Sequence, residues 1–85
     1  MQVSFEERAE KEFLKLSKSI QIQILKYLKK VEALENPKDM GKPLRGNLKD
    51  YWRYRVGDYR LICKIREQEL LVVVVALNHR SKVYK

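Results

Sequence analysis

The sequence contains few of the residues that commonly build metal and cofactor sites. It has one cysteine, Cys63, one histidine, His79, and only three glycines among 85 residues. A single cysteine cannot form an internal disulfide, and a lone histidine without clustered cysteines or carboxylates is not typical of a metal site. The sequence also lacks a glycine-rich loop that would hold phosphates. We therefore expect neither a metal ion nor an organic cofactor.

Long apolar runs are also missing. The longest run, residues 70–77, is much shorter than the roughly 18 residues that a membrane-spanning helix requires. The first residues do not show the basic and then apolar order of a signal peptide, so the sequence predicts a cytoplasmic protein with no membrane partner. Apolar residues still make up 45% of the chain. Without repeats or a low-complexity linker, we expect one domain over residues 1–85.

The positive charge is concentrated in one segment. The net charge is +8, from 19 Lys and Arg against 11 Asp and Glu. Residues 41–66 contain eight basic and two acidic side chains, whereas the segments on either side are close to neutral. A local field of this sign attracts a phosphate backbone or an acidic partner protein. The sequence therefore predicts a polyanionic partner, and RNA is the favoured one.

The first half of the chain has the periodicity of two helices. After a short predicted strand over residues 2–5, apolar residues at steps of three and four predict a first helix that ends near Ser17. Ser4 fits the first position of a capping box for this helix. The second helix would start with Ser17 or Ser19 as its N-cap and end before a proline. Residues 37–49 are predicted to form a long basic loop.

The second half has the alternation of strands. Residues 51–56 and 59–66 flank Gly57-Asp58, a dipeptide that favours a two-residue hairpin turn. The apolar run over residues 70–77 predicts a further strand that is covered on both faces near the centre of a sheet. These patterns predict an α+β fold, in which an N-terminal strand and a helix hairpin pack on an antiparallel sheet of three further strands.

The predicted hairpin gathers basic side chains on one face. Counting outward from the turn pairs Arg55 with Arg60. The same face carries Arg53 and Lys64, because paired residues point to the same side of a sheet. Like charges in this position destabilise a sheet by a few tenths to about 1 kcal/mol, so the pattern indicates an anion bound between them. The alternative is a solvated basic face without a ligand. The other face is expected to pack on the helices and carries Trp52, Tyr54 and Cys63.

Three residues near the C-terminus have side chains suited to RNA cleavage. His79 and Arg80 follow the apolar strand, from whose end a side chain can reach the arginine face, and Tyr84 comes four residues later. A histidine exchanges protons near neutral pH, an arginine stabilises a phosphorane, and a tyrosine stacks on a base. His79 and Tyr84 have an equally simple alternative as ordinary surface residues.

The order of these segments resembles the RelE toxins of the RelE/ParE toxin-antitoxin superfamily. The resemblance covers almost the whole chain and is carried by Phe5-Glu6-Glu7-Arg8-Ala9, Leu44-Arg45-Gly46, Arg53-x-Arg55, Tyr59-Arg60-Leu61 and residues 79–84. It implies a RelE-like fold and a metal-independent endoribonuclease that enters the 30S ribosomal A site, cuts messenger RNA and inhibits translation. Attack by the 2'-hydroxyl would leave a 2',3'-cyclic phosphate and a 5'-hydroxyl.

The resemblance also implies a partner. A cognate RelB-like antitoxin would silence the toxin with an acidic or helical segment, and operator DNA would be bound only through the toxin-antitoxin complex. Because the basic face cannot be neutralised from within the chain, we expect this segment to cover it.

The resemblance assigns roles to matching residues. Arg53 and Arg55 match strand residues that contact and activate the RNA, and Arg60 matches an arginine that stabilises the scissile phosphate. Arg80 matches a C-terminal arginine implicated in catalysis, and Tyr84 matches a tyrosine that stacks on a base. Further basic residues expected to bind RNA are Lys42, Arg45, Lys49 and Lys64.

The sequence departs from the family at the general base. The best-known members have lysine where this chain has Arg53 and Arg55, and an arginine with a pKa above about 12 is a poor base at neutral pH. His79 is the candidate base, because it alone has an unperturbed pKa near 7. The sequence ends one residue after Tyr84, so we expect no further helix to brace that ring.

Two other functions stay open at this point. A ParE-like toxin of the same fold would inhibit DNA gyrase without cutting RNA. A non-catalytic basic module would bind RNA or DNA and have no cleavage activity to lose. The combination of arginines with His79 and Tyr84 favours the RelE branch, since a gyrase inhibitor has no evident need for such a site.

Overall fold

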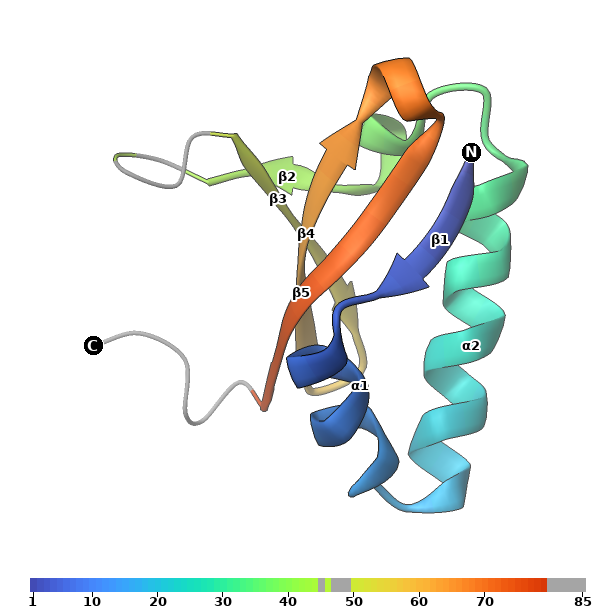
Figure 1. Ribbon diagram of the computed structural model, residues 1–85. Coiled ribbons are helices and arrows are strands. Elements are labelled where there is room, and N and C mark those ends of the chain that lie inside the picture. The colour runs from blue at the N-terminus through green and yellow to red at the C-terminus, as the bar shows by residue number, and fades with distance from the viewer. Residues whose placement is uncertain (45, 47–49, 80–85) are drawn as a thin grey trace.

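The computed structural model describes residues 1–44, 46 and 50–79. In this part of the chain, two helices pack on one five-stranded mixed sheet (Figure 1). The elements are β1 (Gln2–Phe5), α1 (Glu7–Leu14), α2 (Lys18–Ala33), the 3-10 helix η1 (Pro37–Met40), β2 (Lys42–Pro43), β3 (Tyr51–Val56), β4 (Tyr59–Arg66), the 3-10 helix η3 (Glu67–Glu69) and β5 (Leu71–His79). Among these residues no helix has the length and apolar character to cross a membrane.

The strands lie side by side in the order β1-β5-β4-β3-β2. β1 is parallel to β5, with Val3 opposite Val72, and the other neighbours are antiparallel. The predicted α+β fold is confirmed. The sheet has one more strand than expected, because Lys42 and Pro43 pair with β3 inside the segment that was predicted to be a loop.

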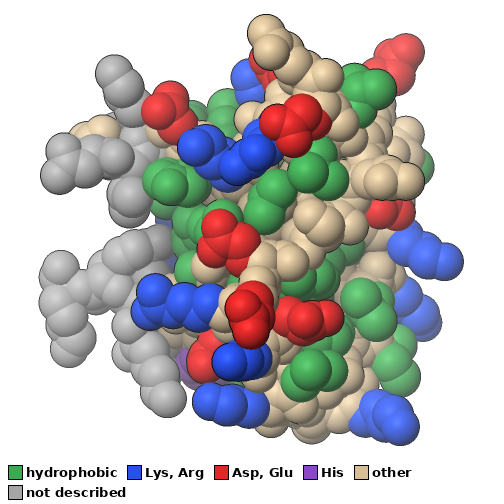
Figure 2. Space-filling view, in the orientation of Figure 1, with side chains coloured by type: hydrophobic (Ala, Val, Ile, Leu, Met, Phe, Trp, Pro, Cys, Tyr) green, Lys and Arg blue, Asp and Glu red, His purple; other side chains and the backbone are tan. Residues whose placement is uncertain are grey.

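Both helices cover the same face of the sheet, and Lys and Arg side chains line the outer margin of α2 (Figures 1 and 2). Ser17 is the N-cap of α2, since its hydroxyl oxygen accepts a hydrogen bond from the backbone N–H of Ile20 at 3.3 Å. The predicted capping box at Ser4 is wrong. Ser4 lies in β1, and the N-cap of α1 is Glu6, whose side chain makes no capping bond. α1 ends earlier than predicted, at Leu14.

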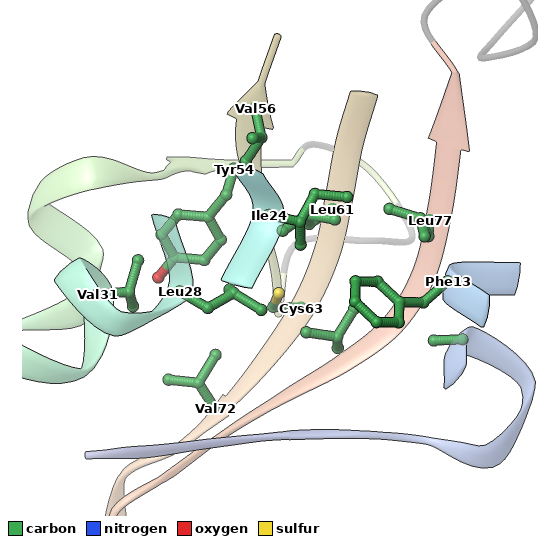
Figure 3. Close-up of a cluster of buried hydrophobic side chains, with 12 residues drawn as sticks. Phe13, Ile24, Leu28, Val31, Tyr54, Val56, Leu61, Cys63, Val72 and Leu77 are labelled. Atoms are coloured by element: carbon green, nitrogen blue, oxygen red, sulfur yellow. The ribbon is translucent and has the colours of Figure 1, made fainter. Parts of the chain in front are cut away.

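The core lies between the helices and the facing side of the sheet (Figure 3). Tyr54 and Cys63 are fully buried there, as the strand alternation predicts. The Tyr54 hydroxyl donates a hydrogen bond of 2.6 Å to the carbonyl oxygen of Pro37, which ties β3 to η1. Burying one large apolar side chain such as Leu61 stabilises the fold by about 1.5–3 kcal/mol. This core holds the hairpin of β3 and β4 in a fixed orientation.

One residue interrupts the pairing of β4 with β5. Ile62 lies opposite Ala76 and Cys63 lies opposite Val74, so Val75 is an extra residue in β5. Such a β-bulge reverses the in-and-out alternation of every residue that follows it. It therefore decides which face each residue at the end of β5 occupies.

The bulge explains the long apolar run of β5. Val72 and Val74 are buried toward the helices before the bulge, and Leu77 is buried toward them after it. Val73 and Val75 are half-buried. The expectation of a strand covered on both faces is wrong, because the described helices cover only one face of the sheet (Figure 1).

Candidate functional site

The turn between β3 and β4 lies where the sequence predicts it. Val56 is opposite Tyr59, and Gly57 has a φ of 59°. Glycine reaches this left-handed region without steric cost, and type II' hairpin turns require it at the first central position. The register of the whole hairpin follows from this turn.

The register brings five basic side chains to the face that the helices leave uncovered. Arg55 is opposite Arg60, and Arg53 lies between Lys42 of β2 and Ile62 of β4. Lys64 lies opposite Tyr51, two residues along β4 from Ile62. The predicted register is confirmed. We call the surface formed by these side chains the basic face, and its members are Lys42, Arg53, Arg55, Arg60 and Lys64.

The charges of the basic face are largely accessible. Lys42, Arg55 and Lys64 are exposed, and Arg53 and Arg60 are half-buried. Ion pairs between described residues lie elsewhere and join Lys11 to Glu7, Lys15 to Glu12, Lys38 to Glu67, and Arg66 to Glu69. Within the described segments, Arg53, Arg55 and Lys64 make no ion pair with a carboxylate. Their positive field is therefore directed at solvent.

Asn78 is a member of this surface that the sequence reasoning missed. It lies opposite Arg60 and is exposed, so its amide is on the same side of the sheet as the arginine pair. The bulge at Val75 puts it there. An amide beside a guanidinium adds neutral donors and an acceptor to a surface that otherwise offers only charged donors.

His79 does not join the basic face. It lies opposite Tyr59, and the two rings meet edge to face with their centroids 5.1 Å apart. Both rings line a cavity of about 150 Å³ together with Glu12 and Leu16, on the helix side of the sheet. The expectation that His79 reaches the arginines is therefore not met, and the physical reason is the reversed alternation after Val75.

The remaining predicted site residues lie outside the described part of the chain. These are Arg45, Lys49, Arg80 and Tyr84.

The chain matches, over residues 3–84, the family described as ParE toxin of type II toxin-antitoxin system, parDE. It is 35% identical over 85 residues to the mRNA interferase toxin RelE of Escherichia coli strain K12, covering 96% of this chain and 87% of that protein. The chain belongs to the RelE/ParE toxin superfamily.

Solved structures of RelE proteins share the fold of this toxin. The toxin-antitoxin complex RelBE2 from Mycobacterium tuberculosis matches with a TM-score of 0.83 and 28% identity, over 95% of this chain and 92% of that one. The isolated Escherichia coli RelE toxin matches with a TM-score of 0.78 and 25% identity, over 96% and 86% of the two chains. The predicted RelE-like fold is thus confirmed.

The chemistry available to this RelE/ParE toxin is that of guanidinium groups. Arginines on two adjacent strands can hold the oxygens of one phosphate and stabilise the extra charge of a pentacovalent phosphorus. The same groups cannot accept a proton at neutral pH. Among the described residues, no group of three or more His, Cys, Asp or Glu side chains is arranged to hold a metal ion.

Cys63 has no part in this chemistry. The thiol is fully buried on the helix side of the sheet, and burial raises its pKa to about 12. It is a core residue, as the strand alternation predicts.

Proposed function

We propose that this toxin is a ribosome-dependent endoribonuclease that cuts messenger RNA in the 30S A site and thereby inhibits translation in the cytoplasm. The observation that carries the proposal is the pair Arg55 and Arg60, which face each other on an uncovered sheet face. The 35% identity to an mRNA interferase, over nearly the full length of both chains, supports it.

The proposed reaction needs no metal ion. The 2'-oxygen attacks the adjacent phosphorus and the bond from phosphorus to the 5'-oxygen breaks, which leaves a 2',3'-cyclic phosphate and a 5'-hydroxyl. Arg60 stabilises the phosphorane oxygens, and Arg53 and Arg55 hold the RNA in position. Arg80 completes the charge stabilisation, and Tyr84 stacks on a base beside the cut.

The proton of the 2'-hydroxyl needs an acceptor. His79 is the predicted base, yet its ring contacts Tyr59 on the other side of the sheet from Arg60. This position argues against the role, and the His79→Gln variant tests it. If His79 has no such role, water accepts the proton of the 2'-hydroxyl and water also gives a proton to the departing 5'-oxygen. The guanidinium groups then accelerate the reaction by stabilising charge.

The proposed RNA contacts extend beyond the reacting phosphate. Lys42 and Lys64 flank the arginines along the sheet and hold neighbouring phosphates. Arg45 and Lys49, which lie between β2 and β3 in the sequence, are assigned the same contacts. The ribosome supplies the in-line orientation of the message, which lowers the barrier more than binding alone can.

We assign the antitoxin to the same surface. Half-buried apolar side chains lie beside the arginines on the uncovered face, namely Ile62, Val73, Val75 and Ala76. A helical segment with one apolar and one acidic side fits this combination. Such a RelB-like partner silences the toxin by covering its site, and operator DNA is bound only through the complex. Affinity for the antitoxin that does not change between low and high salt would contradict this electrostatic contribution.

The test is translation in a purified system with and without the toxin, followed by mapping of the 5' ends of the message. We expect cuts only on ribosome-occupied codons, with a 5'-hydroxyl and a 2',3'-cyclic phosphate at the ends. Arg60→Ala should lower the cutting rate by about 10²–10³. Arg8→Ala is the matched control, because Arg8 is an exposed arginine on α1. A 5'-phosphate at the cut would overturn the metal-free mechanism.

A second function is considered because the matching family is described as a ParE toxin. Inhibition of DNA gyrase without cleavage of translated messages would place the chain in that branch. RNA or DNA binding with neither effect would identify a non-catalytic basic module.

A further inference from the structure

A cationic cavity lies between α2 and the tip of the β3-β4 hairpin. Its volume is about 320 Å³, and α2 contributes Gln23, Lys26, Tyr27 and Lys30 to its lining. The hairpin contributes Arg55 and the residues that follow it. The cavity adjoins the arginine pair through Arg55, and its other lining residues have no part in the proposed cleavage.

The two lysines of α2 both line this cavity because of their spacing in the sequence. Lys26 and Lys30 are four residues apart, so they lie one above the other on one face of α2, and Gln23 precedes them by a turn. Like charges at this spacing destabilise a helix by a few tenths of a kcal/mol. Arg55 borders the cavity from the hairpin side.

Carboxylates do not offset these charges within the described residues. The cavity lining given above contains no Asp or Glu. The ion pairs between described residues also leave out Lys26, Lys30 and Arg55. Positive charge lining a concave surface focuses the field and concentrates anions there.

Gln23 adds a neutral donor beside the turn. A Cβ built on Gly57 would lie 3.4 Å from the side-chain amide nitrogen of Gln23. Because glycine has no Cβ, the space beside this amide is open. Tyr27 also lines the cavity. Its hydroxyl donates a hydrogen bond of 3.3 Å to the carbonyl oxygen of Met40, which holds the ring in place. Two ammonium groups and an amide, with an arginine at the border of the cavity, are together a typical phosphate-binding set.

We propose that this cavity binds a backbone phosphate of RNA outside the codon that is cut. Arg55 connects the cavity with the proposed cleavage site, because it lines the cavity and also lies opposite Arg60 on the basic face. A strand held on the basic face therefore meets the cavity as it passes the hairpin edge. The inference rests on the proposed function in that RNA is the substrate.

The test compares two double variants of the full chain that have equal net charge. Lys26→Gln with Lys30→Gln removes the lysines of the cavity, and Lys18→Gln with Lys29→Gln removes two exposed lysines of the same helix that do not line it. Binding of a 2'-O-methyl RNA decamer, which cannot be cleaved, is measured from 0.05 to 0.5 M salt. Each lost phosphate contact lowers the slope of log K against log salt by about 0.7.

We expect the cavity variant to lose about 0.7–1.4 from this slope and the control variant to keep the wild-type slope. Equal slopes in both variants overturn the inference, even if the wild type cuts messages on the ribosome. A reduced slope only in the cavity variant upholds it, even if no cleavage is found. Weaker antitoxin binding with unchanged RNA binding assigns the cavity to an acidic protein and also overturns it.

A measurement on the unaltered chain removes any dependence on the folding of the variants. In a titration with the same decamer, the amide signals of Gln23 and Gly57 should shift in nuclear magnetic resonance spectra. Shifts confined to β3 and β4, with the Gln23 side-chain amide unchanged, contradict the inference.

Discussion

Arg55 faces Arg60 across the hairpin, and it borders the cavity that the lysines of α2 line, so the folded toxin holds it near like charges. Replacing it with glutamine should stabilise the free protein. The cross-strand pair alone costs a few tenths to about 1 kcal/mol. For a chain of 85 residues this corresponds to a rise in Tm of about 1–8 °C. The glutamine retains part of the aliphatic stem, which limits the loss of packing.

The assay is thermal unfolding of the wild type and of Arg55→Gln, each at 0.05 and 1 M NaCl, together with cleavage of ribosome-bound message. We expect the gain in Tm to shrink at high salt, because the Debye length falls to about 3 Å at 1 M. Cleavage should fall while stability rises. Arg8→Gln is the control and should not raise Tm. A lower Tm for Arg55→Gln, or a gain that is independent of salt, would refute the electrostatic reasoning.

Four further results are expected. Tyr54→Phe should lose about 1–3 kcal/mol of stability in urea unfolding, since the buried carbonyl of Pro37 loses its donor. Ser17→Ala should lose about 1 kcal/mol in the same assay, because the backbone at the start of α2 loses its cap. Cys63 should not react with a thiol reagent at pH 8 until the protein is unfolded, since burial raises its pKa to about 12. His79→Gln should cut message within about tenfold of the wild-type rate, whereas loss of a true general base costs about 10²–10⁴.

The hairpin and its basic face could be predicted because a single short signal determines them. Gly57-Asp58 marks the turn, and the partners of Arg53 and Arg55 then follow by counting. The same counting puts Tyr54 and Cys63 in the core, where both are fully buried. The residue preference of the turn and the alternation of side chains between the two faces of a strand are sufficient to predict this part of the fold.

The end of β5 could not be predicted in the same way. A continuous apolar run has no alternation in which an extra residue would be visible, so the bulge at Val75 leaves no trace in the sequence pattern. Its effect reaches the site, because it exchanges the faces that Asn78 and His79 occupy. The histidine was therefore expected beside the arginines, and the asparagine was missed.

Features that depend on tertiary contacts were also beyond the sequence. β2 is two residues long and exists only because Lys42 and Pro43 lie against β3. The cavity beside Lys26 and Lys30 depends on how α2 lies against the hairpin, which helical periodicity alone does not determine. Ser4 satisfied the spacing of a capping box, but pairing with Val73 of β5 holds it in a strand.

The place of β5 in the sheet has a consequence for the synthesis of the toxin. Among the described strands β5 is made last, yet it lies between β1 and β4. A growing chain can form its helices and the β3-β4 hairpin early, but Val3 must wait for Val72 to leave the ribosome. The strands that carry the arginines therefore become part of the five-stranded sheet only after β5 has been made.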